Sequence, residues 1–170
     1  MQIILLGIAA ILGFLFVVIL ISALIGVPCL PTHSKQARKM IELASLKDGM
    51  KAVDLGSGAG RLLFLAAKSG AKIVGYELNP VLVIWSRLMI RLRGLSKNIR
   101  VVMKSVYKAD LKNADVIFTF LMNGPMKKLE PKLFSECKPG ATIISYTFPI
   151  PGHEPVHVED GIFVYKVGEV

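Results

Sequence analysis

The order of hydrophobic and polar positions divides the chain into an apolar leader and a longer remainder in which two periodicities alternate. Residues 3–27 contain no charged side chain, and the first charge of the chain is that of Lys35. Beyond it, short runs rich in β-branched residues alternate with stretches whose apolar positions recur about every 3.6 residues. This alternation of strand and helix patterns predicts an α/β domain built on a parallel sheet.

The same patterns predict the approximate bounds of the elements. A first helix is predicted on one shared apolar face, formed by Ala37, Met40, Ile41 and Ala44. The predicted strands cover residues 51–55, 72–77, 100–103, 115–121, 141–148, 156–159 and 161–167, and the main helices between them cover residues 61–69, 80–93 and 125–137. Strands and helices should alternate up to the fifth strand, and the last two strands should pair antiparallel. The predicted fold class is therefore α/β: a Rossmann-like, doubly wound, mostly parallel seven-stranded sheet.

The apolar leader is long enough to span a membrane if it is helical. At ~1.5 Å per residue, residues 3–27 would extend about 37 Å, which exceeds the ~30 Å hydrocarbon core of a bilayer. A cleaved signal peptide would need a basic start and an apolar run of only ~7–15 residues, and the leader has neither. We therefore expect one transmembrane helix over residues 1–27, a membrane-exit linker over residues 28–34 and a folded domain over residues 35–170.

The charges beside the leader predict its orientation. No basic residue precedes it, whereas five follow it closely: Lys35, Arg38, Lys39, Lys47 and Lys51. Basic flanks stay on the cytoplasmic side of a membrane. The expected location is therefore that of a single-pass membrane protein, with the N-terminus outside and the domain in the cytoplasm.

A glycine-rich turn between the first predicted strand and the next helix is the strongest candidate for a ligand site. It runs from Asp54 to Arg61, with Gly56, Gly58 and Gly60 at alternate positions. Glycines allow positive φ angles and let a ligand approach the bare backbone. A dinucleotide fingerprint Gly-x-Gly-x-x-Gly that started at Gly56 would need its third glycine where Arg61 stands. The spacing Asp-x-Gly-x-Gly-x-Gly is instead that of S-adenosylmethionine (SAM) methyltransferases.

A carboxylate at the end of the second predicted strand supports the same interpretation. The apolar run that begins at Ile73 ends at Glu77. In doubly wound nucleotide-binding folds, an acid at this place accepts hydrogen bonds from the ribose hydroxyls. Asn79 and Pro80 follow, a pair typical of a helix start.

The basic charge of the chain indicates which kinds of partner it could bind. The formal net charge is +9, and the segment 87–112 holds eight bases but only one acid, Asp110. Beside a membrane anchor, the favoured partner is an anionic lipid surface. RNA is the competing partner, but nucleic acid is not favoured because no basic stripe interleaved with aromatic residues is present. A solvated basic face is the third interpretation. No metal site is predicted, because His33, His153 and His157 are scattered.

Four blocks of sequence together resemble a particular family. They are Val27-Pro-Cys-Leu-Pro-Thr32, the glycine block Val53–Arg61, Gly75-Tyr-Glu-Leu-Asn-Pro80 and Phe148-Pro-Ile-Pro151. With the apolar leader, they are similar to the small single-pass protein-lysine N-methyltransferases of mitochondria, which modify the c-subunit of ATP synthase or the adenine nucleotide translocase, and to their prokaryotic relatives. The resemblance implies a class I methyltransferase that uses SAM, releases S-adenosylhomocysteine and methylates lysine in a membrane-associated protein.

The resemblance also implies roles for individual residues. The glycines would hold the methionine part of SAM, Asp54 would orient its ammonium group, and Tyr76 or Leu78 would pack on adenine. The family tends to carry Ser-Asp-Leu-Trp after the third strand, where this chain has Lys104-Ser-Val-Tyr107, so Ser105 replaces the expected aspartate. The full set expected to bind the cofactor is Asp54, Gly56, Ser57, Gly58, Gly60, Glu77, Leu78, Asn79 and Ser105.

The acceptor side is less marked in the sequence. No residue stands out as a general base, and the candidates for lining the acceptor site are Thr32, Asn123 and Tyr146. The first hypothesis is a SAM-dependent N-methyltransferase that acts on lysine of a membrane-associated protein. The alternatives are methylation of a lipid headgroup or small lipophilic molecule, and a non-catalytic SAM-binding membrane scaffold, which the replacement at Ser105 motivates.

Overall fold

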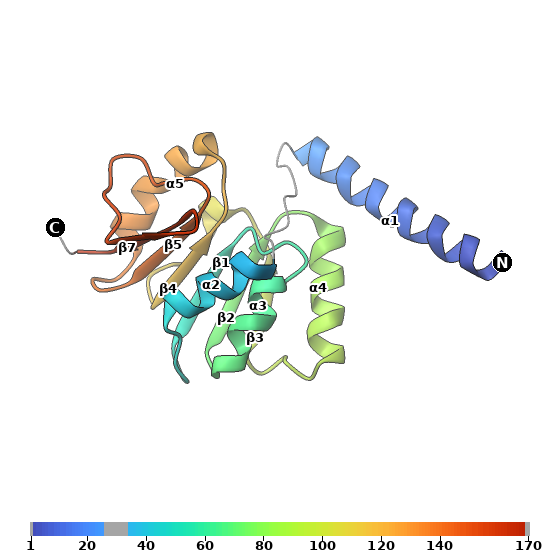
Figure 1. Cartoon of the computed structure of the whole chain (residues 1–170), viewed down its shortest axis with the longest axis horizontal. Helices are drawn as coiled ribbons and strands as arrows, with labels where there is room; N and C mark the ends of the chain where they lie inside the picture. The colour runs from blue at the N-terminus through green and yellow to red at the C-terminus, as the bar shows by residue number, and fades with distance from the viewer. Residues whose placement is uncertain (1, 26–33, 169–170) are drawn as a thin grey trace.

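The computed structural model describes residues 2–25 and 34–168, without the side chains at positions 18 and 21–25. Residues 34–168 are organised around a seven-stranded sheet in the order β3-β2-β1-β4-β5-β7-β6 (Figure 1). The strands are β1 (Lys51–Leu55), β2 (Lys72–Glu77), β3 (Ile99–Met103), β4 (Val116–Thr119), β5 (Thr142–Tyr146), β6 (His157–Glu159) and β7 (Ile162–Lys166). The first five pair in parallel, and β7 runs antiparallel to both β5 and β6. The predicted mostly parallel sheet is confirmed.

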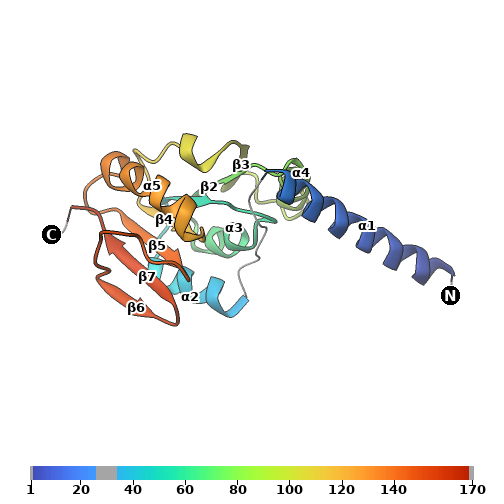
Figure 2. The same ribbon diagram turned by 90° about the horizontal axis from the view of Figure 1, so that it is seen from above.

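Helices cover both faces of this sheet, as a doubly wound fold requires (Figures 1 and 2). One apolar cluster joins the sheet to α2 (Ser34–Ala44), α3 (Arg61–Ala66) and α4 (Pro80–Leu92), through side chains such as Met40, Leu63 and Val83. A second cluster joins the opposite face to α5 (Asn123–Glu136), through Met126 and Leu133. A 3-10 turn, η1 (Ala67–Ser69), extends α3. The predicted helix pattern therefore places the core on both sides of the sheet.

The start of α4 follows from two adjacent residues. The Asn79 side-chain oxygen accepts hydrogen bonds from the backbone N–H groups of Val81 and Leu82, at 3.0 and 3.4 Å. Pro80 occupies the first helical position, where a missing N–H costs nothing. This capping arrangement confirms the predicted helix start and fixes the turn that follows Glu77.

Several predicted bounds were too long. Strands were expected over residues 115–121 and 141–148, but β4 ends at Thr119 and β5 ends at Tyr146. The backbone turns away at Thr147, whose φ is 67°. Between β3 and β4 the structure has only a 3-10 turn, η2 (Val106–Lys108), where the alternation predicted a helix. Apolar and aromatic runs continue past the paired residues, so hydrophobic periodicity does not reveal where pairing stops.

The apolar leader forms the helix α1 (Gln2–Ile25), which touches α4 through the rings of Phe14 and Trp85, 5.6 Å apart between centroids. Over the described residues, no helix combines the length and apolar character needed to cross a membrane. The predicted single-pass location, with the N-terminus outside and a cytoplasmic domain, is thereby contradicted.

Candidate active site

The glycine turn follows β1 at the carboxyl edge of the parallel strands. Gly56, Gly58 and Gly60 have φ angles of 91°, 53° and 86°, in the left-handed region that favours glycine. The backbone N–H groups of Gly56 and Ser57 donate to the carbonyl oxygen of Tyr76, at 2.9 and 3.0 Å. The turn is therefore held against the end of β2.

The three glycines have different surroundings. A Cβ added at Gly58 would meet no atom within 4 Å, and one added at Gly56 would meet only a Leu121 side-chain atom at 3.9 Å. A Cβ at Gly60 would instead lie 3.2 Å from the Phe64 ring. Gly56 and Gly58 thus border open space in which a ligand can rest on the backbone, whereas Gly60 allows α3 to pack closely.

Glu77 joins the glycine turn to the turn before α4. One carboxylate oxygen accepts a hydrogen bond from the backbone N–H of Gly58 at 2.9 Å. The other accepts from the N–H groups of Leu78 and Asn79, both at 2.8 Å. A carboxylate offers about four acceptor positions, so these bonds leave room for a hydroxyl donor. Glu77 therefore orders the loop, and its hydrogen bond to a ribose stays a prediction.

Asp54 is a buried acid in β1, two residues before the first glycine of the turn. Its side chain is 7% exposed, and its neighbours in the sheet are Gly75 and Phe118. Burial, with a smaller contribution from the charge of Glu77, raises the pKa of Asp54 to about 7. A cationic group beside it would stabilise the ionised form.

The chain matches known proteins over most of its length. The sequence profile described as the ANTKMT methyltransferase domain matches residues 54–157, more than half of the chain. The chain belongs to this family. A protein-lysine N-methyltransferase of Saccharolobus islandicus (strain REY15A) is 33% identical over 153 residues, which cover 84% of this chain and 95% of that protein. The family predicted from the four sequence blocks is confirmed.

Other relatives are longer than this chain. A lysine N-methyltransferase of Xenopus laevis, named for the C-subunit of ATP synthase, is 32% identical, over 83% of this chain and 64% of that protein. The adenine nucleotide translocase lysine N-methyltransferase of Mus musculus is 34% identical, over 83% of this chain and 63% of that protein. The chain thus spans somewhat less than two thirds of these two relatives.

A solved structure supports the fold and the cofactor. The crystal structure of an RNA methyltransferase from Salinibacter ruber in complex with S-adenosyl-L-homocysteine is 30% identical, with a TM-score of 0.76. The match covers 83% of this chain and 96% of that chain. This family member is therefore a class I methyltransferase with SAM as its cofactor. The residues fit that cofactor, because Gly56 and Gly58 border open space, and the carboxylate of Glu77 binds the Gly58 N–H beside it.

The other predicted cofactor residues of this methyltransferase fall into two groups. Leu78 is 38% exposed and Ser105 is half-buried at the start of η2, so both remain predictions for the adenine side. Asn79 and Ser57 instead face the protein: Asn79 caps α4, and the Ser57 hydroxyl stands 2.6 Å from where a Gly75 Cβ would be.

Tyr76, considered at first for adenine packing, belongs to the core. It is 7% exposed, and its hydroxyl accepts a hydrogen bond from the backbone N–H of Asp110 at 3.0 Å. Of the two residues expected to pack on adenine, Tyr76 and Leu78, only Leu78 has an exposed side chain. Across the described residues, no group of three potential metal ligands comes together.

The acceptor candidates are spread over three segments. Thr32 lies outside the described residues, and Asn123 is exposed at the first position of α5. Tyr146 ends β5, and its ring lies 4.8 Å from that of Phe120, which in turn stacks with Phe148 at 6.2 Å. Sequence reasoning missed Phe120, because an aromatic residue after an apolar strand is indistinguishable from core. Phe148 belonged to the recognised Phe-Pro-Ile-Pro block but had no assigned role.

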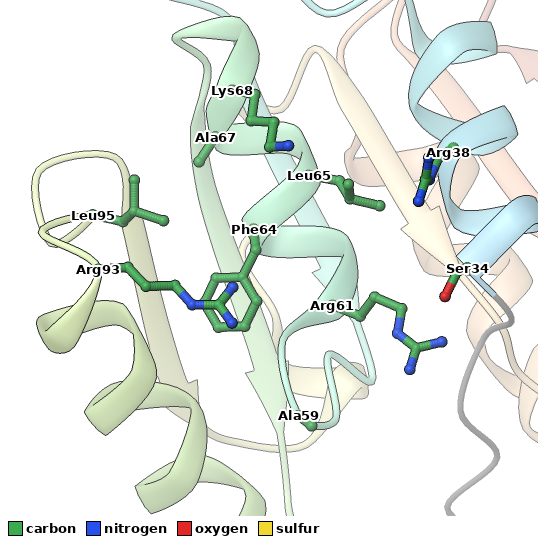
Figure 3. Close-up of a pocket in the computed structure, with 10 residues that line it drawn as sticks. All are labelled: Ser34, Arg38, Ala59, Arg61, Phe64, Leu65, Ala67, Lys68, Arg93 and Leu95. Atoms are coloured by element: carbon green, nitrogen blue, oxygen red, sulfur yellow. The ribbon is translucent and has the colours of Figure 1, made fainter.

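A basic hollow of about 530 Å³ lies beside the glycine turn (Figure 3). None of its lining residues is acidic: they are Ser34, Arg38, Ala59, Arg61, Phe64, Leu65, Ala67, Lys68, Arg93 and Leu95. The Arg93 guanidinium lies over the Phe64 ring, 4.3 Å from its centroid. Of the basic residues in segment 87–112, Arg93 alone lines this hollow. The positive charge near the turn is therefore assembled by folding from α2, α3, the 3-10 turn η1 and the loop after α4.

The raised pKa of Asp54 predicts pH-dependent cofactor binding. Below its pKa of about 7 the side chain is neutral, and in the role predicted for it Asp54 would then attract the cofactor ammonium less strongly. SAM affinity should therefore rise about fivefold from pH 6 to pH 7, where the ligand's α-amino group stays protonated. Calorimetric titration in buffers of different ionisation enthalpy should also detect a proton released on binding. Asp54→Asn should bind SAM more weakly and without this dependence; a wild-type affinity that is flat over the window would contradict the prediction.

Proposed function

We propose that this methyltransferase transfers the methyl group of SAM to the side-chain amine of a lysine in an acceptor protein. The observation that carries the proposal is the match to the Saccharolobus protein, which is named a protein-lysine N-methyltransferase and aligns over 95% of its length. The names of the Xenopus and mouse relatives, for lysine methylation of the ATP synthase C-subunit and of the adenine nucleotide translocase, support the same substrate class.

The arrangement of the site supports this chemistry. When bound, SAM supplies an electrophilic methyl group on a sulfonium. The backbone at Gly56 and Gly58, with Asp54 and Glu77, would hold the cofactor at the carboxyl edge of β1 and β2. The acceptor then approaches from the ends of β4 and β5, and positioning provides most of the lowering of the barrier. Lysine must react as the neutral amine, which a water-poor site favours by lowering the amine pKa. Its proton passes to solvent.

A labelling experiment tests the substrate class. The purified protein is incubated with SAM carrying a tritiated methyl group and a cell extract freed of small molecules, and the products are hydrolysed in acid. Before hydrolysis the label should be protease-sensitive. After acid hydrolysis it should coelute with Nε-methylated lysine. Gly58→Val protein is the inactive control. Label that partitions into lipid solvent would contradict the proposal and favour a lipid headgroup acceptor.

The nature of the acceptor protein is a finer part of the proposal. We expect a membrane-associated acceptor, as the sequence blocks suggested. Separation of the labelled extract into membrane and soluble fractions tests this expectation. Label confined to soluble proteins would contradict it, without affecting the assignment of lysine as the target.

RNA methylation is a second candidate, and a specific observation favours it. The Salinibacter structure, which is 30% identical and covered over 96% of its length, is titled as an RNA methyltransferase. The basic hollow beside the glycine turn would suit a phosphate backbone. The same labelling experiment separates the two candidates, since nuclease-sensitive and protease-resistant label would favour RNA.

A further inference from the structure

Three aromatic side chains meet near the glycine turn, from the segment after β4, the end of β5 and the loop that follows β5. Phe120 comes just after β4, Tyr146 ends β5, and Phe148 lies two residues further along the chain. The Phe120 ring centre is 4.8 Å from that of Tyr146 and 6.2 Å from that of Phe148. All three side chains are half-buried, so each keeps part of its surface accessible.

The register of the sheet places this aromatic trio next to the glycine turn. Leu55 of β1 pairs with Thr119 of β4, and Thr119 pairs with Ser145 of β5. The residues that come next along the chain are Gly56 just after β1, Phe120 just after β4, and Tyr146 at the end of β5. Phe120 therefore follows β4 directly beside the first glycine of the turn, at the edge where the reactive methyl group must be presented.

The backbone between Tyr146 and Phe148 is strained. Thr147 has a φ of 67°, an outlier for a β-branched residue. The Phe148 N–H donates to the Tyr146 carbonyl at 2.9 Å, which closes a γ-turn of the rare positive-φ type. Such a turn reverses the chain within three residues and directs the Tyr146 and Phe148 side chains toward Phe120. Strained backbone of this kind tends to occur at functional sites.

The surrounding structure holds the turn in place at several points. The Thr147 N–H donates to the Gly161 carbonyl at 2.8 Å, and the Ser145 hydroxyl donates to the Phe148 carbonyl at 2.6 Å. Further along, the Ile150 N–H donates to the Tyr165 hydroxyl at 2.9 Å. The His153 ring stacks on Phe134 with centroids 3.5 Å apart. These contacts keep the aromatic trio in one arrangement despite the strain.

We propose that the aromatic trio binds the acceptor lysine, an inference that rests on the proposed function. The ring faces would pack along the aliphatic stem of the lysine and exclude water around its amine. As the amine nitrogen bonds to the methyl carbon, the carbon–sulfur bond breaks, its electron pair stays on sulfur, and the positive charge moves to nitrogen. Aromatic faces attract such a cation, including its methylated forms, which have fewer N–H donors. The trio is therefore expected to accept mono- and dimethyllysine as substrates.

The test compares the labelling rate of variants that replace one ring of the trio by leucine, with extract proteins as the acceptors. Phe148→Leu and Phe120→Leu should lower the rate of label transfer into protein lysine at least tenfold, while the Kd for S-adenosylhomocysteine stays within about twofold of wild type and Tm is little changed. The matched control is Phe163→Leu, because Phe163 is also half-buried but packs on the opposite face of the sheet.

A second measurement reports on binding without turnover. In protein saturated with S-adenosylhomocysteine, the probe Nα-acetyl-trimethyllysine methyl ester should shift the NMR signals of the aromatic trio, and Phe148→Leu should abolish the shift. If wild type labels lysine but the trio variants match Phe163→Leu, the aromatic proposal is overturned and the lysine assignment stands. If wild type labels RNA or lipid instead, the proposed function fails and this inference fails with it.

Discussion

Gly58→Val is expected to abolish SAM binding. The φ of Gly58 is 53°, and a Cβ there would point into space free of protein atoms within 4 Å, the space assigned to the cofactor. A β-branched side chain in that space would exclude the methionine part of the ligand, and its backbone preference would distort the turn. The Gly58 N–H that donates to Glu77 would shift as well. We expect calorimetry to show a loss of affinity on the order of 100-fold or more.

Gly49→Val provides the matched control for backbone strain. Gly49 has a φ of 78° and also has no atom within 4 Å of an added Cβ. It precedes β1, so it lies at the amino ends of the parallel strands, away from the glycine turn. Both variants should lose stability to a similar extent, since both place a β-branched residue at positive φ. Only Gly58→Val should lose cofactor binding. Equal SAM affinity in the two variants would show that Gly58 does not border the cofactor.

Glu77→Ala is expected to weaken SAM binding at least tenfold and to loosen the glycine turn. The substitution removes the acceptor of three backbone N–H groups, those of Gly58, Leu78 and Asn79, in addition to any ribose contact. Hydrogen bonds to a charged group contribute ~1.5–3 kcal/mol each, but these donors are only partly buried and water can replace part of the loss. We expect the free energy of unfolding to fall by about 2 kcal/mol. Denaturant unfolding and calorimetry measure the two effects separately.

Glu77→Gln distinguishes the structural role of this carboxylate from its role in binding. The amide oxygen can still accept from Leu78 and Asn79, whereas the amide nitrogen cannot accept from the Gly58 N–H. This variant should unfold close to wild type and still bind SAM poorly. Normal SAM affinity in either variant would refute the assignment of Glu77 to the ribose.

The glycine turn and the strand-end acid that are expected to hold the cofactor could be located from sequence, because each is a short motif with a characteristic spacing. The roles given to the alternate glycines, to Asp54 and to Glu77 follow from their spacing, and they remain predictions. Sequence did not separate residues that face the ligand from residues that face the protein. Asn79, Ser57 and Gly60 belong to the same motifs, yet their side chains or their added Cβ would point toward α4, Gly75 and Phe64. That direction depends on packing between β2, α3 and α4.

The acceptor half was much less predictable. Tyr146 was an acceptor-site candidate by itself. Phe120 and Phe148 come next to it only because β4 and β5 lie side by side and Thr147 turns the chain back. The basic hollow is similar, since Arg38, Arg61, Lys68 and Arg93 come from separate segments. The predicted membrane span also rested on one-dimensional hydropathy, and the described residues contradict it.

By itself, the sequence determined most of the alternation of strands and helices, the class I methyltransferase family and the position of the glycine turn. These properties depend on local φ preferences, on periodicity and on the spacing of a few residues, all of which can be read from the sequence. Only the tertiary structure decided which strand ends are adjacent, which aromatic side chains converge after β4 and β5, and why the pKa of Asp54 is raised. The physical reason is that burial, register and electrostatic environment arise from residues brought together across the sheet, and sequence distance does not encode them.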